Sequence, residues 1–175
     1  MKGERMKRLL VAWIVTLICI GPVCAGDLML WYDKPANTGM NEALPIGNGK
    51  LGGLVYAGPE QERVVLNEIS LWTGTEISDD DYSKMGWYEM LGELLVNVAP
   101  DVAAGPVQNY RRSLDLATAV HTVSYRSGAV TFQREAFASH PDQVMVLKFS
   151  ADRPGACTGT VQLQGAHKEI TTAAD

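Results

Sequence analysis

The chain has 175 residues, of which 46% are hydrophobic and 20% are charged, and its formal net charge is −5 at pH 7. This composition excludes an intrinsically disordered chain, and the length suffices for one hydrophobic core. The acidic balance disfavours nucleic acid and anionic membranes as partners.

Residues 1–25 have the pattern of a secretory signal peptide. A basic start precedes the uncharged apolar run Leu9–Val23, and Val23-Cys24-Ala25 offers a cleavage site. We expect cleavage after Ala25 and a secreted or periplasmic protein with one mature domain, residues 26–175. An uncleaved anchor is the alternative, but the run is shorter than the ~20 residues of a spanning helix. A lipoprotein start at Cys24 is disfavoured because Val23 stands where such signals prefer a small residue.

Loss of this leader removes four basic residues and one acidic residue, so the formal charge moves from −5 to −8. It also removes two of the three cysteines and leaves Cys157 alone. The mature domain therefore has no intramolecular disulfide and depends on packing.

The first mature segments predict strands and tight turns. Leu28–Tyr32 is apolar and aromatic and predicts a strand, with Trp31 expected in the core and a sugar platform as its alternative. Asn37–Asn48 is rich in turn formers and predicts a loop. Leu51–Ala57 and Glu62–Asn67 then predict a hairpin around Gly58-Pro59-Glu60-Gln61.

A nucleotide-binding reading of this region fails. Gly47-Asn48-Gly49-Lys50-Leu51-Gly52 fits G-x-G-x-x-G, but that motif needs a strand before it and a helix after it. Pro45 interrupts the preceding segment, and β-favouring residues follow the glycines. We expect a turn that leads into the hairpin.

The second half of the chain continues the strand-and-turn pattern. Asp79-Asp80-Asp81 lacks calcium-loop spacing and predicts a solvated loop, and residues 101–108 predict another loop. The guanidinium groups of Arg111 and Arg112 have the geometry to hold a carboxylate. The commoner outcome for such residues is a structural ion pair at a sheet edge, and we expect that here.

Ser127-Gly128 predicts a hairpin turn between residues 120–125 and 129–138. Its alternation places Val123, Tyr125, Val130 and Phe132 on a core face, whereas Arg126 and Gln133 face water. Residues 143–150 and 158–164 predict two more strands, the latter alternating Val161 and Leu163 with polar neighbours. The whole pattern predicts an all-β fold, a sandwich or half of a barrel.

Four ordered blocks between Leu30 and Ala151 carry a family resemblance: ALPIGNGKLGGLVYAG, ERVVLNEISLWTG, YRRSLDLATAVHTVSY and FQREAFASHPDQVMVLKFSA. They resemble the N-terminal region of glycoside hydrolase family 95, the inverting α-L-fucosidases and α-L-galactosidases. The resemblance implies an incomplete N-terminal β-sandwich and places a strand at Leu94–Val98, where Gly92 weakens a helix. It also implies that this is a fragment without the C-terminal helical (α/α)6 barrel, which carries a catalytic Glu acid and Asp base.

Inverting hydrolysis requires two carboxyl groups. The chain offers five candidates, Glu42, Glu68, Glu76, Asp115 and Glu135. Because the resemblance places catalysis in the helical barrel, we expect no catalytic residue here. The whole enzyme would hydrolyse terminal α-L-fucosyl or α-L-galactosyl residues of glycans, and this fragment alone would be inactive. The alternative is a non-catalytic carbohydrate-binding or structural β-sandwich module.

Four side chains are candidates for a substrate rim, because they bear the groups that bind sugars: Asn48, Asn67, Glu68 and Trp72. Their structural alternatives are a turn held by Asn48, a bridge to the next domain made by Asn67 and Glu68, and an interface plug formed by Trp72. We expect no cofactor and no metal, since the histidines are widely spaced and Cys157 has no C-x-x-C partner.

Overall fold

A computed structural model of the chain describes residues 28–37, 39–74, 84–98 and 105–167. The expected signal peptide, the Asp79–Asp81 run and Glu76 lie outside these residues. The described part is built from β-strands, which confirms the all-β prediction: β1 (Met29–Tyr32), β2 (Leu44–Gly47), β3 (Leu51–Val55), β4 (Gln61–Glu68), β5 (Gly92–Val98), β6 (Val107–Asp115), β7 (Val120–Ser127), β8 (Val130–Ser139), β9 (Val144–Ala151) and β10 (Gly159–Gly165).

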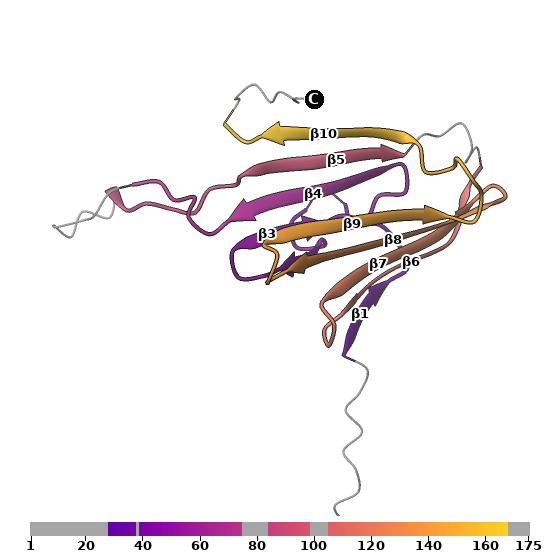
Figure 1. The fold of residues 1–175 in the computed structure, drawn as a ribbon, viewed down its shortest axis with the longest axis horizontal. Helices are drawn as coiled ribbons and strands as arrows, with labels where there is room; N and C mark the ends of the chain where they lie inside the picture. The colour runs from indigo at the N-terminus through magenta and orange to yellow at the C-terminus, as the bar shows by residue number, and fades with distance from the viewer. Residues whose placement is uncertain (1–27, 38, 75–83, 99–104, 168–175) are drawn as a thin grey trace, which may run out of the picture.

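The strands form two five-stranded sheets that pack face to face (Figure 1). Sheet A has the order β1-β6-β7-β8-β9, and sheet B has the order β10-β5-β4-β3-β2. Every neighbouring pair is antiparallel. The expected β3–β4 and β7–β8 hairpins are both present, and β5 begins two residues before the predicted strand.

Two of the three buried hydrophobic clusters in the described residues are formed as follows. One joins Leu44 and Ile46 of β2 to Val55, Val64, Leu114 and Ala136, and the other joins Ala57 and Ala156 to Val123, Tyr125, Val130 and Phe132. The expected alternation of β7 and β8 is confirmed, since Arg126 and Gln133 are exposed. Period-2 patterning therefore identified the buried face of the central strands correctly.

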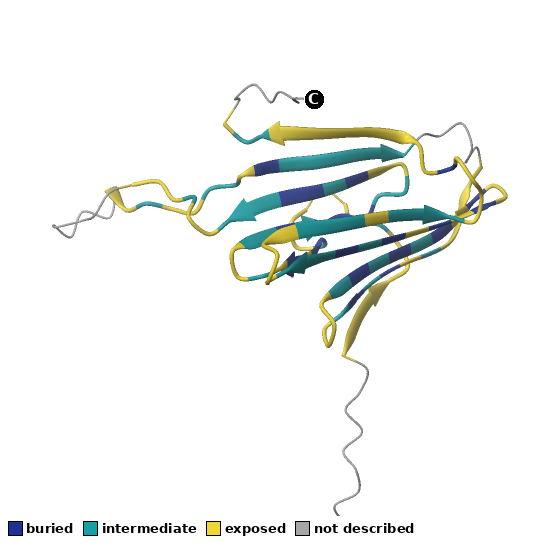
Figure 2. Cartoon of the chain, viewed as in Figure 1, coloured by how far each residue is buried: buried dark blue, intermediate teal, exposed yellow. Residues whose placement is uncertain are grey.

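The two sheets are offset, so that one outer strand of each lacks a full covering layer. Every residue of β1 is exposed, and so is nearly all of β10 (Figure 2). Val161, expected to alternate with polar neighbours, is consequently exposed rather than buried. Alternation predicts which side chains share a face, whereas the opposite sheet decides whether that face is covered.

The loop predicted for Asn37–Asn48 is wrong in part, because β2 occupies Leu44–Gly47 and pairs with β3. Leu44 and Ile46 point into the core while Pro45 and Gly47 are exposed. Pro45 is tolerated because β2 is the edge strand of sheet B, where one side of the backbone makes no ladder bonds. A strand, β2, therefore does precede the glycine motif. The element that follows the motif is strand β3 and not the helix that a nucleotide site needs, so the hairpin prediction is confirmed.

Trp31 is not a core residue, and within the described ranges neither Arg111 nor Arg112 forms the expected ion pair. Trp31 is 56% exposed, and the Arg111 guanidinium lies 4.7 Å from the centre of its ring. Arg112 is buried, where its Nε donates to the Lys34 carbonyl oxygen at 2.9 Å and its Nη1 to the Glu42 carbonyl oxygen at 2.7 Å. Arg112 therefore fastens the chain between β1 and β2. The strand β6 also begins at Val107, inside the predicted loop.

Candidate functional site

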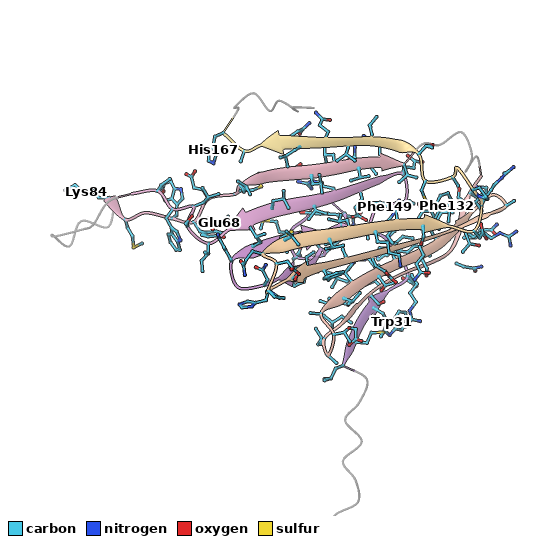
Figure 3. The ribbon with its side chains drawn as sticks, in the orientation of Figure 1. Trp31, Glu68, Lys84, Phe132, Phe149 and His167 are labelled. Carbon is cyan, nitrogen blue, oxygen red and sulfur yellow. The ribbon has the colours of Figure 1, made fainter. Side chains whose placement is uncertain are left out.

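Three of the four rim candidates lie at one end of sheet B. Asn48 lies in the turn between β2 and β3, and Asn67 and Glu68 lie at the end of β4. Register brings them together, since Gly52 pairs with Asn67 and Leu51 pairs with Glu68. Figure 3 labels Glu68 at this end of the molecule.

Asn48 uses both ends of its amide inside the domain. Its Oδ1 accepts hydrogen bonds from the backbone amides of Lys50 at 3.0 Å and Leu51 at 2.8 Å. Its Nδ2 donates to the Ser139 carbonyl oxygen at 2.7 Å, which ties sheet B to the β8–β9 turn of sheet A. Gly49 completes the turn with φ of +89°, a conformation that favours glycine.

Glu68 caps the bend that follows β4. Its Oε2 accepts hydrogen bonds from the Ser70 hydroxyl and from the Ser70 backbone amide, the latter at 2.9 Å. These two bonds hold the pKa of the Glu68 carboxyl below its ordinary value. The neighbouring Asn67 side chain is half-buried within β4.

Trp72 belongs to a projection between β4 and β5, whose described arms are residues 69–74 and 84–91. We call these arms the aromatic ribbon (Figure 3, leading to Lys84). Trp72 pairs with Tyr88 across the arms, and the two rings meet edge to face at 5.4 Å. The indole Nε1 donates to the Ile69 carbonyl oxygen at 3.0 Å. Trp72 therefore lies beside the other three candidates, on a separate projection.

The other described carboxylate candidates also have structural partners. Glu42 accepts from the Asn37 amide at 2.7 Å, and Asp115 accepts from the Ala117 amide at 2.8 Å. In each case the backbone hydrogen bond is the main reason that the pKa of the carboxyl is lowered. Glu135 lies 3.0 Å from the Lys148 ammonium on the surface of sheet A.

Two cavities in the described part of the chain are large enough for a small ligand, and carboxylates line neither. One, of about 420 Å³, opens between β9 and β10 and is mostly apolar, with Leu94, Val96, Leu147, Phe149 and Val161 among its lining residues. The other, of about 450 Å³, is bordered by Asn37, Tyr56 and Arg63. A pair of carboxyl groups across a cleft, as inverting hydrolysis requires, is therefore not found in either cavity.

In the described ranges, no group of three or more His, Cys, Asp or Glu side chains is placed to hold a metal ion. Within the same ranges, no helix has the length and apolar character to cross a membrane.

Comparison with known families gives a match over residues 30–87 and 81–175 to the description "Glycosyl hydrolase family 65, N-terminal domain". The chain belongs to this family. As a glycosyl hydrolase N-terminal domain, it is similar to three curated proteins. Alpha-L-fucosidase 2 of Arabidopsis thaliana is 33% identical over 159 residues, which cover 74% of this chain and 19% of that protein.

Two fungal proteins show the same relationship. Probable alpha-fucosidase A of Aspergillus niger is 30% identical over 157 residues, covering 70% of this chain and 20% of the relative. Probable alpha-fucosidase A of Aspergillus oryzae is 27% identical over 158 residues, which cover 70% of this chain and 21% of that protein. This glycosyl hydrolase N-terminal domain therefore spans about a fifth of the length of these curated relatives.

The most elaborate polar cluster of the glycosyl hydrolase N-terminal domain was not anticipated. At the end opposite the ribbon, buried Arg134 donates from Nη1 to Glu62 at 3.2 Å and from Nη2 to the Tyr125 hydroxyl at 2.8 Å. The same guanidinium donates to the carbonyl oxygens of Gly58 and Pro59, each at 2.6 Å. Burial raises the pKa of Glu62 against the opposing attraction of Arg134.

A signal for this cluster was present in the sequence of the glycosyl hydrolase N-terminal domain. Arg134 falls in the inward register of β8, two residues after Phe132, and Glu62 falls in the register of buried Val64. Two opposite charges at inward positions of separate strands predict a buried ion pair. Because Glu62 also accepts from the Ala57 amide at 2.8 Å, the pair holds the β3–β4 turn rather than facing a cleft.

Proposed function

We propose that this chain is the N-terminal domain of a secreted α-L-fucosidase-type glycosidase of family 95. The intact enzyme would hydrolyse terminal α-L-fucosyl, or α-L-galactosyl, residues of glycans with inversion. The observation that carries this proposal is the similarity to three proteins whose names are α-fucosidases. The four ordered sequence blocks support the family 95 assignment, and the basic and apolar leader supports secretion.

The domain itself serves as a non-catalytic scaffold in this proposal. A general acid for glycoside hydrolysis needs a raised pKa and access to the leaving-group oxygen. Glu68 and Asp115 have lowered pKa values and partners in their own turns, whereas Glu62 is buried in the pair with Arg134. The catalytic acid and base would therefore come from a helical domain elsewhere in the longer polypeptide.

The test is to express the full natural reading frame that contains this chain. The enzyme is expected to hydrolyse p-nitrophenyl α-L-fucopyranoside or the matching α-L-galactopyranoside. Glu68→Gln and Asp115→Asn should keep kcat within about threefold of the parent, because neither carboxylate reaches the reacting atoms. Hydrolysis of neither substrate would refute the glycosidase, and a loss of about a thousandfold in either variant would move the chemistry into this domain.

A free-standing carbohydrate-binding module is the competing function. The exposed aromatic rings of the ribbon favour it, because rings of this kind stack on sugars. Calorimetric titration with L-fucose and D-galactose distinguishes the two. Affinity for either sugar without hydrolysis by the full-length protein would favour the binding module, and hydrolysis would favour the enzyme.

A further inference from the structure

The aromatic ribbon gathers large apolar side chains in water. Trp72 is 62% exposed and Trp87 is 67% exposed, and the exposed set continues through Ile69, Met85 and Tyr88. Exposed single apolar residues are ordinary, but neighbouring ones gathered on one projection mark interaction surfaces. Trp, Tyr and Met are also enriched at the cores of protein interfaces.

The ribbon is ordered before any partner binds. The Thr73 amide donates to the Trp87 carbonyl oxygen at 3.0 Å, and the Glu89 amide donates to the Leu71 carbonyl oxygen at 3.0 Å. The arms approach so closely that a Cβ at Gly86 would overlap the Thr73 carbonyl oxygen. A surface that is already in its binding conformation loses less entropy when it docks.

Three of the four rim candidates beside these rings use their polar groups within the domain. The Trp72 indole N–H, the Glu68 carboxylate and the Asn48 amide all have the internal partners described above. The Thr73 hydroxyl accepts a hydrogen bond from the Trp87 amide at 3.3 Å. A sugar site requires free hydrogen-bonding groups around its aromatic platform, whereas an apolar protein surface does not.

We propose that the aromatic ribbon is the surface on which the catalytic domain of the same polypeptide docks, with Trp72 and Trp87 as its anchors. This inference rests on the proposed function. The partner is chosen because the chain spans about a fifth of relatives that carry α-fucosidase names, so a far larger part of such an enzyme lies outside this domain. The docking face of that part is apolar and accepts two indole rings.

The test is hydroxyl-radical footprinting of the full-length enzyme, read by mass spectrometry against the same enzyme unfolded in urea. Docking predicts that Trp72 and Trp87 are modified at about a tenth of their unfolded rate. Undocked rings with the exposed fractions given above would be modified at about half of their unfolded rate. Trp31 is the matched control, since it is an exposed tryptophan on β1, away from the ribbon (Figure 3).

A pair of variants gives a second readout in the same enzyme. Trp87→Ser should raise the modification rate of Met85 about fivefold by loosening the docked surface. Trp31→Ser should leave the rate of Met85 unchanged. Equal rates of Met85 modification in the two variants would count against docking.

Three outcomes would overturn the inference in an active enzyme. Trp72 and Trp87 modified at half their unfolded rate would mean that nothing covers them. Protection that appears only with 2′-fucosyllactose would assign the ribbon to glycan, and protection that grows with enzyme concentration would assign it to a second copy. Failure of the proposed function is separate, because it is seen as absent hydrolysis of both glycosides while the footprint still reports on the ribbon.

Discussion

At the end of the sandwich where β4 begins, Arg134, Glu62 and Tyr125 lie buried, and the two charged side chains among them are paired with each other. Where β4 ends, the molecule instead extends the aromatic ribbon into solvent, with Trp72 and Trp87 more than half exposed. The first end is closed by its own side chains, and we call it the sealed end. At the second end, the side chains of Asn48 and Glu68 and the Trp72 indole N–H have internal partners, while the large apolar side chains of the ribbon are not covered.

The difference separates what stabilises this domain from what it offers to others. A buried ion pair stabilises only when hydrogen bonds satisfy both partners, and the sealed end meets that condition through the Gly58 and Pro59 carbonyl oxygens. The ribbon contributes little burial to the domain itself. Substitutions at the sealed end should therefore change folding, and substitutions at the ribbon should change association.

The largest effect is expected from Arg134→Met, which leaves the Glu62 carboxylate buried without its partner. The free energy of unfolding should fall by about 3–5 kcal/mol in urea denaturation. Adding Glu62→Gln to Arg134→Met should restore part of this loss, because the unpaired charge is then gone. A fall smaller than about 1 kcal/mol for the single variant would show that the sealed end does not depend on this pair.

A second prediction contrasts the satisfied pair with His121, a buried side chain of β7 whose Nε2 has no hydrogen-bond partner in the described part of the chain. Burial, with a smaller contribution from Arg112, lowers the pKa of His121 to about 4. The unfolded chain, with an ordinary pKa near 6.5, binds the proton first. The stability that the neutral buried His121 contributes is therefore fully present above pH ~6.5. The free energy of unfolding falls by about 3 kcal/mol from this residue as the pH drops to ~4.

The measurement is urea denaturation between pH 7.5 and 4, with His121→Leu as the control. Protonation of carboxylates such as Asp115, whose pKa is lowered, also destabilises the protein in acid. The difference in the free energy of unfolding between the parent and His121→Leu therefore isolates the histidine. The free energy of unfolding of the parent should fall more steeply with decreasing pH than that of the variant. Parallel curves would contradict a neutral buried His121.

At the ribbon end, Asn48→Ala should cost about 1–2 kcal/mol, because two backbone amides and the Ser139 carbonyl oxygen lose their partner. Thermal or urea denaturation of the domain measures this directly. Lys50→Ala is a suitable control, since Lys50 lies exposed in the same turn and the turn bond is made by its backbone amide. An equal loss in both variants would mean that the turn is not held by the asparagine side chain.

The smallest effect on folding is expected from Trp72→Ala, at about 0.5–1 kcal/mol, because the ring is exposed and loses only its contact with Tyr88 and a solvent-accessible hydrogen bond to the Ile69 carbonyl oxygen. The same denaturation experiment applies, with Trp31→Ala as a second exposed tryptophan. A loss comparable to that of Arg134→Met would show that the ribbon belongs to the folding core, and would remove the contrast between the two ends.

The sequence by itself determined the strand-and-turn pattern of this protein, the two central hairpins and the buried faces of β7 and β8. It did so because side chains alternate with period 2 and because Gly and Pro mark tight turns, both of which are local properties. The ordered blocks also predicted a glycoside hydrolase N-terminal domain, which the family match supports at that coarser level.

Only the tertiary structure decided what lies opposite each strand. It made Leu44–Gly47 an edge strand that the turn-rich sequence concealed, and it left Trp31 and Val161 exposed where the two sheets are offset. It also gave Arg112 two backbone carbonyl oxygens in place of a carboxylate. The physical reason is that burial and pairing depend on residues distant in the chain, whose register no local pattern encodes.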